Sequence, residues 1–394
     1  MRVNVVTPWY PDRTSVYLGV FVAQQVEALR RRGIEVDVEV PHLYPAPPGP
    51  IPAEVVDAMR CLADRDPGLI YPQEAGTTWI PAPVPSRSGY AGRATAFAAA
   101  IAEKRRVMPV DADVTHAHLG VPTGAALLDG DAPPLVVTEH QSTLDLVLRE
   151  PAARAMYLDV IRAAAAFFVV SQHLADRLQE EFGDVVADKV GVMPNIVDLS
   201  DLPFVERAEF DCSSWIYVGA LTSHKGGQLL VKSFVEYRRD YAANATLTVI
   251  GGGDLSDWAI KYCRAHGAGE ALRLMGAVEH ARLGGFFADA DLMVHLSSAE
   301  TFGIASLEAI GSGLPVVSLR NGGAEHNWGG IEPIAGSILD RSSSPTDVAA
   351  AVDGLRRNPA RLELSRARRF IERSFGPDAV ASRLEAVYRE VVER

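Results

Sequence analysis

The chain has 394 residues, of which 48% are hydrophobic and 22% are charged, and its formal net charge is −12 at pH 7. This length predicts two domains, and the acidic balance disfavours nucleic acid and anionic lipid as partners. No apolar run approaches the roughly 20 residues that span a bilayer. The three cysteines, Cys61, Cys212 and Cys263, lie far apart and form no C-x-x-C pair. We therefore expect a cytoplasmic protein without a disulfide or a structural metal.

The first half of the chain alternates between strand and helix patterns. Residues 2–7 predict a strand, and residues 20–32 predict a helix that Gly33 ends. Further strands are expected at residues 34–40, 113–116, 135–138 and 167–170, with helices at 122–128 and 172–182. A polar, proline-containing stretch at residues 196–211 predicts an interdomain linker.

The second half repeats this alternation. Strands are expected at residues 215–218, 245–250, 272–275, 291–296 and 314–318, and an amphipathic last helix at 378–392. Strands that alternate with helices in both halves predict an α/β protein with two doubly wound, mostly parallel sheets that face each other across a cleft. We place the two domains at residues 1–200 and 211–376.

Residues 41–85 are rich in proline and show little periodicity, so we expect a long irregular segment there. Such segments inside compact domains are often functional loops. Tyr44 and Trp79 lie in this segment and could stack on the face of a sugar or another ring. The segment is therefore our candidate for contacts with an acceptor substrate.

The most informative segment runs from Glu300 to Glu308, two carboxylates with seven residues between them. It follows an expected strand, so Glu300 lies at the carboxyl end of that strand, where open α/β sheets bind ligands. Glu308 falls inside the helix that follows. Backbone N–H groups around Phe302, Gly303 and Ile304 form the start of this helix and attract phosphate. Carboxylates beside a phosphate site suit a sugar nucleotide.

Two further loops follow strands of the second half. The loop from Gly219 to Gly226 contains Lys225, which could contact a diphosphate, although a solvated lysine is the commoner reading of such a loop. Gly251 begins a glycine turn whose backbone could lie close to a base or a phosphate. It could equally be an ordinary turn. Neither loop has the G-x-G-x-x-G pattern, so a dinucleotide-binding fingerprint is missing.

In the first half, His140 follows a strand at its carboxyl end, which favours a functional position. His116 lies on the preceding strand and His118 just after it, so the two should point the same way if that strand extends to His118. We interpret His116 as a core residue and His118 as a candidate for the cleft and for acceptor binding.

Gly19 precedes the first helix, where its backbone could approach a phosphate. No recognisable metal-binding set of histidines, cysteines or carboxylates appears.

Taken together, these motifs resemble the retaining family-4 glycosyltransferases with the GT-B fold over nearly the whole chain. The resemblance rests on Gly19, on the T-x-H at residues 138–140, on Met-Pro-Asn at 193–195 and on V-G-x(5)-K ending at Lys225. The strongest match is E-x-F-G-x(4)-E-A at residues 300–309, followed by G-x-P-V-V at 313–317.

The resemblance implies a role for each matching residue. Glu300 would accept hydrogen bonds from the transferred sugar, and Glu308 from the ribose of the nucleotide. Lys225 and the amides at Phe302 and Gly303 would hold the diphosphate. His140, Lys225 and Glu300 would be the catalytic set, and Gly19, Gly219, Gly251, Phe302, Gly303, Ile304 and Glu308 would complete the donor site. The resemblance also implies that residues 377–394 pack back on the first domain, which would bind the acceptor while residues 211–376 bind the donor.

The chain departs from the family at Ala220, where these enzymes usually have an arginine. Half of the cationic clamp on the leaving diphosphate is therefore missing, and His224 or Arg320 are candidates to replace it. The implied reaction moves a hexosyl group from a nucleoside diphosphate sugar, with UDP favoured, to a hydroxyl of a small soluble acceptor with retention. Neither a metal nor another cofactor is expected, and the negative charge of the protein would suit a cationic acceptor.

Other functions compete with this one. A sugar-nucleotide epimerase or a sugar-phosphate-using phosphorylase can share the two-domain architecture. A non-catalytic sugar-nucleotide-binding partner protein is the alternative that Ala220 favours. A nicotinamide oxidoreductase is disfavoured by the missing fingerprint.

Overall fold

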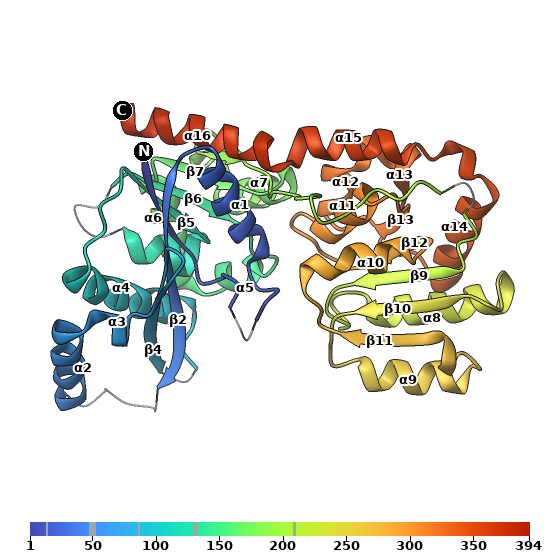
Figure 1. Ribbon diagram of the computed structural model, residues 1–394, viewed down its shortest axis with the longest axis horizontal. Coiled ribbons are helices and arrows are strands. Elements are labelled where there is room, and N and C mark those ends of the chain that lie inside the picture. Colours follow the sequence, from blue (N-terminus) through green and yellow to red (C-terminus); the bar gives the residue numbers. More distant parts are fainter. Residues whose placement is uncertain (13–14, 47–52, 86, 129–132, 208–209) are drawn as a thin grey trace. The chain divides into compact units, whose positions relative to one another are not determined.

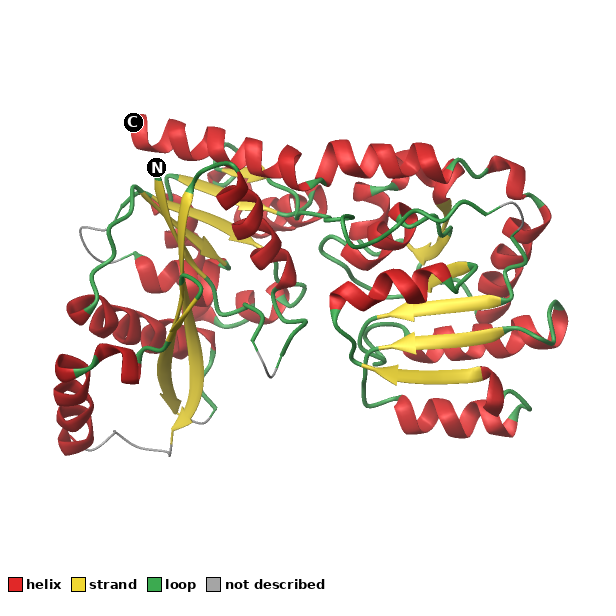
Figure 2. Ribbon diagram, in the orientation of Figure 1, coloured by secondary structure: helices red, strands yellow, loops and turns green. Residues whose placement is uncertain are grey.

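The computed structural model describes residues 1–12, 15–46, 53–85, 87–128, 133–207 and 210–394. The chain divides into two compact units. Unit 1 comprises Met1–Asp12, Leu18–Pro194 and Val380–Arg394, and unit 2 comprises Arg13–Tyr17 and Asn195–Ala379. The expected linker at residues 196–211 therefore counts with unit 2 by its contacts. Strands alternate with helices in both units (Figure 2), which confirms the α/β class.

Unit 1 is built on an eight-stranded sheet in the order β3-β4-β2-β1-β5-β6-β7-β8, parallel except for the β3–β4 pair (Figure 1). Its strands are β1 (Arg2–Val6), β2 (Glu35–Ala46), β3 (Gln73–Glu74), β4 (Thr77–Pro85), β5 (Val114–His118), β6 (Leu135–Glu139), β7 (Ala166–Val169) and β8 (Val190–Val192). Its helices are α1 (Val20–Arg31), α2 (Ala53–Arg65), α3 (Pro67–Ile70), α4 (Tyr90–Val107), α5 (Leu144–Leu148), α6 (Pro151–Ala163) and α7 (Gln172–Phe182), with short η1 (Gly120–Gly124), η2 (Ala125–Leu127) and η3 (Gly183–Val185).

Unit 2 is built on a six-stranded parallel sheet in the order β11-β10-β9-β12-β13-β14. Its strands are β9 (Ser214–Val218), β10 (Thr246–Ile250), β11 (Leu272–Gly276), β12 (Leu292–His295), β13 (Val316–Leu319) and β14 (Gly336–Leu339). Its helices are α8 (Gly227–Asp240), α9 (Ser256–Ala265), α10 (Leu283–Ala288), α11 (Ile304–Gly311), α12 (Gly323–Asn327), α13 (Glu332–Ala335), α14 (Pro345–Arg357) and α15 (Leu364–Phe375), with short η4 (Gly269–Ala271), η5 (His280–Arg282), η6 (Gly329–Ile331) and η7 (Pro359–Arg361).

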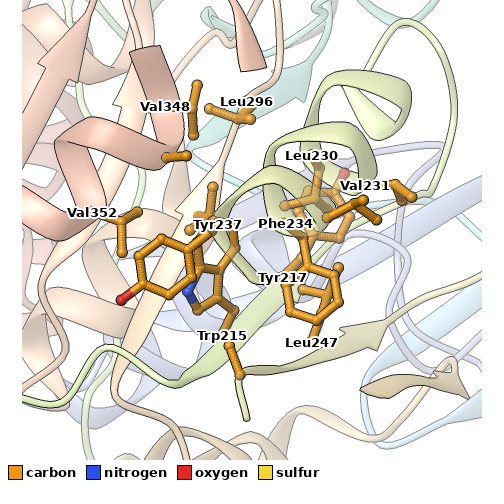
Figure 3. Close-up of a cluster of buried hydrophobic side chains, with 14 of the residues drawn as sticks. Trp215, Tyr217, Leu230, Val231, Phe234, Tyr237, Leu247, Leu296, Val348 and Val352 are labelled. Carbon is orange, nitrogen blue, oxygen red and sulfur yellow. The ribbon is translucent and has the colours of Figure 1, made fainter. Parts of the chain in front are cut away.

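The core of unit 2 fixes the strand that carries the Lys225 loop. Trp215 and Tyr217 of β9 are fully buried, and the Trp215 ring packs 5.0 Å from that of Tyr237 and 5.7 Å from that of Phe234 on α8 (Figure 3). Burial of aromatic side chains contributes about 1.5–3 kcal/mol each to folding. The end of β9 is therefore held rigidly where the loop begins.

The last helix, α16 (Pro377–Glu393), confirms the amphipathic pattern. Val380, Leu384, Tyr388 and Val391 are buried on one face of it. The hydroxyl of Tyr388 lies 2.6 Å from Nδ1 of His116 on β5. This contact anchors the C-terminal segment within unit 1.

The expectation of an irregular segment at residues 41–85 is wrong for residues 41–46 and 53–85, and residues 47–52 lie outside the part of the chain that the structure describes. Strand β2 continues to Ala46 and pairs in parallel with β4, from Val38 opposite Thr77 to Ala46 opposite Pro85. The prolines of β4 lie at alternate positions (Pro81, Pro83 and Pro85), so the missing N–H groups all fall on one edge of the strand. The other edge keeps its donors, which is why a proline-rich sequence can pair here.

The expected helix at residues 122–128 is also wrong. The structure has η1 and η2 there, preceded by Leu119 with a φ of 81° and containing a cis Val121–Pro122 bond. The other expected strands and helices are present with small shifts of their ends, and α7 begins and ends at the expected residues. Gly183 is the C-cap of α7, with a φ of 65°.

Candidate functional site

The order of the strands in unit 2 defines where a ligand should bind. Strand β9 lies between β10 on one side and β12 on the other, so the chain direction around the sheet reverses between β9 and β12. Ligands of open α/β sheets bind at such a switch point, outside the carboxyl ends of the strands. Lys225 follows β9 and Glu300 follows β12, and their side chains meet, with 2.8 Å between Nζ and Oε1.

Glu300 is held as an anion by two cationic or polar neighbours. Nε2 of His295, the last residue of β12, lies 3.1 Å from the same Oε1 that Lys225 contacts. Burial by itself raises the pKa of a carboxyl, but His295 and Lys225 outweigh it and hold the pKa of Glu300 at about 2. Glu300 is therefore a permanent acceptor near neutral pH and not a proton donor.

The helix that begins beside Glu300 leaves its backbone donors accessible. Gly303 is the N-cap of α11 with a φ of 83°, and no atom lies within 4 Å of where its Cβ would be. The Phe302 side chain points into the core, where its ring packs 5.3 Å from that of Phe375. Asn327 donates to the Phe302 carbonyl at 2.7 Å. The segment thus presents backbone N–H groups, starting near Ile304, in an arrangement that suits an anion.

Two consecutive glycines follow β13, Gly322 in the loop and Gly323 at the start of α12, and Gly323 packs against this segment. A Cβ on Gly323 would come within 2.8 Å of the Phe302 carbonyl and 3.0 Å of Cβ of Glu300. The backbone N–H of Glu300 also donates to the carbonyl of Asn321 at 2.7 Å. The loops after β12 and β13 are therefore locked together, which fixes the position of Glu300.

Glu308 lies in the second turn of α11 and is nearly buried. Its Oε1 lies 2.6 Å from Nε2 of His280 in η5. This hydrogen bond to Glu308, opposed by burial, raises the pKa of His280 above its ordinary value, and the charges of Glu308, Asp201 and Asp198 add to the increase. The pair places a carboxylate, oriented by an imidazole, on the same short helix as the anion site.

Gly219 and Gly251 approach each other at the ends of β9 and β10. A Cβ on Gly251 would lie 2.2 Å from the carbonyl oxygen of Gly219, so this glycine serves the close packing of two loops. Ala220 follows Gly219 and is exposed. Of the two candidates to replace the missing arginine, His224 lies beside Ser298, which donates to its carbonyl at 3.0 Å, and Arg320 points to Asp340, 3.5 Å away.

In unit 1, the histidines form a buried cluster at the carboxyl ends of β5 and β6. His116 and His118 point the same way, as expected, with ring centroids 4.6 Å apart. Nδ1 of His118 lies 2.8 Å from Nε2 of His140, and the His140 ring lies 4.7 Å from that of Phe21 on α1. His118 is completely buried, so the expectation that it contacts an acceptor from an open cleft is wrong.

Gly19 and the aromatic acceptor candidates lie elsewhere in unit 1. Gly19 is the N-cap of α1 with a φ of 71°, and a Cβ there would lie 2.1 Å from the Trp9 carbonyl oxygen. Position 19 therefore requires glycine, because a side chain there would collide with the backbone of Trp9. Tyr44 on β2 is 58% exposed and lies opposite Pro83, whereas Trp79 lies opposite Val40. The structure separates Tyr44 from Trp79 by four residues along the strands, or about 13 Å at about 3.3 Å per residue.

Sequence reasoning missed two site residues, His295 and His280. His295 could have been found from the sequence, because it is the last residue of a strand. His140 was chosen as a candidate for a similar position, directly after a strand. His280 could not, since nothing in its local sequence relates it to a residue 28 positions later. Across the described part of the chain, no group of three or more histidines, cysteines or carboxylates is arranged to hold a metal ion. No helix within the same residues is long and apolar enough to cross a membrane.

Comparison with known families matches both halves of the chain. Residues 18–201 match the family described as Glycosyltransferase Family 4, and residues 213–374 match the family described as Glycosyl transferases group 1. The second match contains Lys225, Glu300 and Glu308. The first match ends within the expected linker at residues 196–211, and the second begins just after it.

Curated relatives include two kinds of sugar transferase. The chain is 29% identical to a glycogen synthase of Mycobacterium tuberculosis over 235 residues, which are 58% of this chain and 55% of the relative. The match thus spans about half the length of that enzyme. A D-inositol 3-phosphate glycosyltransferase of Catenulispora acidiphila is 28% identical over 312 residues, 72% of this chain and 74% of the relative.

Solved structures share the fold over the full length. Sucrose-phosphate synthase from Thermosynechococcus elongatus aligns with a TM-score of 0.75 at 16% identity, covering 100% of this chain and 99% of that one. The Anabaena protein Alr3699/HepE, solved with UDP and glucose, aligns with a TM-score of 0.68 at 14% identity, covering 99% and 100%. Both family matches, in the expected order on two doubly wound units, lead to one conclusion: the chain belongs to the family-4 glycosyltransferases with the GT-B fold.

Proposed function

We propose that this protein is a retaining hexosyltransferase that uses a nucleoside diphosphate sugar as donor and a hydroxyl of a small soluble molecule as acceptor. The observation that carries the proposal is the contact of Lys225 with Glu300 at the switch point of unit 2, beside the start of α11. A cation, a set of free amides and a permanent carboxylate together match a diphosphate joined to a hydroxyl-rich ring.

We assign a role to each residue of the site from the charge of its side chain. Lys225 and the amides near Gly303 hold the β-phosphate, and Glu300 accepts hydrogen bonds from hydroxyls of the sugar. Glu308, held by His280, accepts from the ribose. UDP is the first donor nucleotide to test, since the Anabaena structure and a pneumococcal O-GlcNAc transferase structure of the same fold hold UDP.

The reaction breaks the bond between the anomeric carbon and the β-phosphate oxygen, and the electron pair stays on that oxygen. Negative charge grows on the phosphate, where the Lys225 ammonium and the helix amides stabilise it, an effect that often dominates catalysis. The acceptor oxygen bonds to the anomeric carbon on the same face, and its proton passes to the leaving phosphate oxygen. In this scheme Glu300 and Glu308 bind substrate and do not form the acid and base pair of a glycoside hydrolase.

The acceptor is the less defined partner. The net charge of −12 would favour a neutral or cationic molecule over an anionic one. All three cysteines are free, in keeping with a reaction in the cytoplasm.

The test begins with binding. Calorimetry with UDP, GDP, ADP and TDP compares the native protein with Glu308→Gln and with Glu270→Gln, an exposed carboxylate of unit 2 that serves as the matched control. Loss of one good hydrogen bond to a charged group costs about 1.5–3 kcal/mol, so we expect Glu308→Gln to weaken binding of one diphosphate roughly 10- to 100-fold. If no diphosphate binds, or if Glu308→Gln binds it normally, the donor site is wrongly assigned.

Turnover separates the alternatives. The sugar form of the bound nucleotide is incubated with and without a panel of hydroxylated acceptors, and the anomeric configuration of the product is read by NMR. Retention supports the proposal. A changed sugar without acceptor identifies an epimerase, and binding without any turnover identifies the non-catalytic partner that Ala220 would favour.

A further inference from the structure

The structure places His118 in a buried position with polar neighbours in unit 1, which differs from the acceptor contact expected from the sequence. It is the last residue of β5 and is completely buried, yet both of its ring nitrogens have a polar neighbour. Nδ1 lies 2.8 Å from Nε2 of His140, and Nε2 lies 3.4 Å from the amide nitrogen of Gln25 on α1. A buried imidazole with two such neighbours is a link between them and not a substrate contact.

The chemistry of the neighbours sets the direction of these hydrogen bonds. An amide NH₂ can only donate, so Nε2 of His118 accepts from Gln25. A neutral imidazole has one donor and one acceptor nitrogen, so Nδ1 of His118 carries the proton and donates it to Nε2 of His140. His140 is then left with its own proton on Nδ1.

This assignment requires that His118 is neutral. Burial lowers the pKa of His118 well below its ordinary value, and the neighbouring His116 and His140 lower it further. Burial also lowers the pKa of His116 to about 3. His116 and His118 are therefore neutral imidazoles near neutral pH.

Other contacts hold His140 in the same position. The carboxylate of Glu139 accepts from the backbone N–H of His140 at 2.8 Å and from that of Gln141 at 2.7 Å. The Phe21 ring packs on the His140 ring. Glu139 thus fixes the backbone, Phe21 limits the tilt of the ring, and the hydrogen bond from His118 to Nε2 selects the tautomer.

We propose that His118 is a positioning residue that fixes the ring orientation of His140 and keeps its proton on Nδ1. The importance of this for sugar transfer rests on the proposed function. In that function, the Nε2 lone pair of His140 accepts the hydrogen bond from His118, so His140 does not serve as a general base through that nitrogen.

The first measurement needs neither substrate nor variant at His118. The protein is labelled with ¹⁵N-histidine, and long-range ¹H–¹⁵N correlations report which nitrogen of each ring is protonated. His140→Gln identifies the His140 signals among the 10 histidines. We expect Nδ1–H on both His118 and His140, and a proton on Nε2 of His140 would overturn the proposal.

Two variants of equal size then isolate the hydrogen bond. His118→Asn keeps a donor at the position of Nδ1, whereas His118→Leu has nearly the same shape and no donor. We expect His140 to keep its tautomer in His118→Asn and to show a mixture of both in His118→Leu. His116→Leu, on the same strand but without a hydrogen bond to His140, is the control that should leave the His140 signals unchanged.

Kinetics supply the functional readout. Loss of a positioned group through a shift of about 1 Å can cost about 10²-fold, so kcat/KM should fall by up to that factor in His118→Leu and be largely restored in His118→Asn. An unchanged tautomer in a folded His118→Leu overturns the proposal. If the native protein turns over no sugar nucleotide, the proposed function fails, while the NMR result still decides the role of His118.

Discussion

Glu308 and His280 are joined by a 2.6 Å contact between Oε1 and Nε2. His280 belongs to η5, which precedes α10, whereas Glu308 belongs to α11, so two separate elements define the position of one carboxylate. A single hydrogen bond with His280 holds Oε1 of Glu308 in place. The ribose that we assign to Glu308 would bind to a carboxylate that is positioned in advance, which lowers the entropy lost on binding.

The contact between His280 and Glu308 makes stability depend on pH. The pKa of His280 is raised in the folded state, so its contribution is complete below about 6.5, the ordinary value for the unfolded chain, and is lost as the pH rises through the folded value. His280→Gln keeps an N–H donor but has no charge. We expect the melting temperature of the native protein to exceed that of His280→Gln by more at pH 5.5 than at pH 9. An equal difference at both values would show that the charge of His280 adds nothing.

The charge of Glu300 should make the stability of the protein depend on pH in the opposite direction, with stability lost in acid. Its pKa is held at about 2 against an ordinary 4.5, so its stabilising effect is present above pH 4.5 and is lost as the pH falls toward 2. Glu300→Gln should therefore unfold more easily than the native protein at pH 7, and the gap should narrow by pH 3. Urea unfolding at the two pH values measures it. If the difference in unfolding free energy between the native protein and Glu300→Gln is the same at both pH values, the destabilisation comes from lost packing and not from lost charge.

Lys225 should affect the rate more than the fold. We expect Lys225→Met to lower kcat about 10²- to 10³-fold, the loss typical when one preorganised stabiliser of a developing charge is removed. The comparison variant is Lys232→Met on α8, which removes the same charge from another position of unit 2. Steady-state kinetics with saturating donor distinguishes them, and a normal kcat for Lys225→Met would remove Lys225 from the catalytic set.

Gly303 offers a test with a matched control elsewhere in the chain. Gly303 and Gly33 have φ values of 83° and 78°, and neither would place a Cβ within 4 Å of another atom. Alanine at either position should cost about 1–2 kcal/mol of stability, since only the left-handed backbone conformation opposes it. Only Gly303→Ala should also weaken diphosphate binding, which calorimetry measures. Equal affinity in the two variants would place the anion away from α11.

Tyr388 tests the packing of the C-terminal helix in unit 1. Tyr388→Phe removes the hydroxyl that lies 2.6 Å from Nδ1 of His116 and leaves a buried nitrogen without that partner. We expect a loss of about 1–3 kcal/mol in the free energy of unfolding, the usual cost of an unsatisfied buried polar group. The exposed Tyr44→Phe is the control and should change stability by less than about 0.5 kcal/mol. Equal stability of the two variants would show that this contact contributes little.

Local patterns in the sequence were enough to identify the class of fold and to place Lys225 and Glu300 in loops after strands. The bounds of α7 and most of the described strands follow from short-range periodicity and backbone preferences. The carboxyl ends of strands also predicted Lys225 and Glu300, because parallel strands carry their loops to one edge of a sheet. The extension of β2 to Ala46 and its partner strand β4 were missed, since prolines usually oppose a sheet and only their alternate spacing permits one.

The partners of the site residues were decided by the tertiary structure. Nothing local connects Glu308 with His280, Glu300 with Lys225 75 residues earlier, or His118 with His140. These pairs form because the order of the strands brings distant loops together. Exposure depends on the same packing, which is why His118 could be placed on its strand from sequence but its burial could not. The sequence by itself determines which residues can bind or carry charge, and the packed sheet determines which of them meet, because contact requires closing long loops that no short-range pattern encodes.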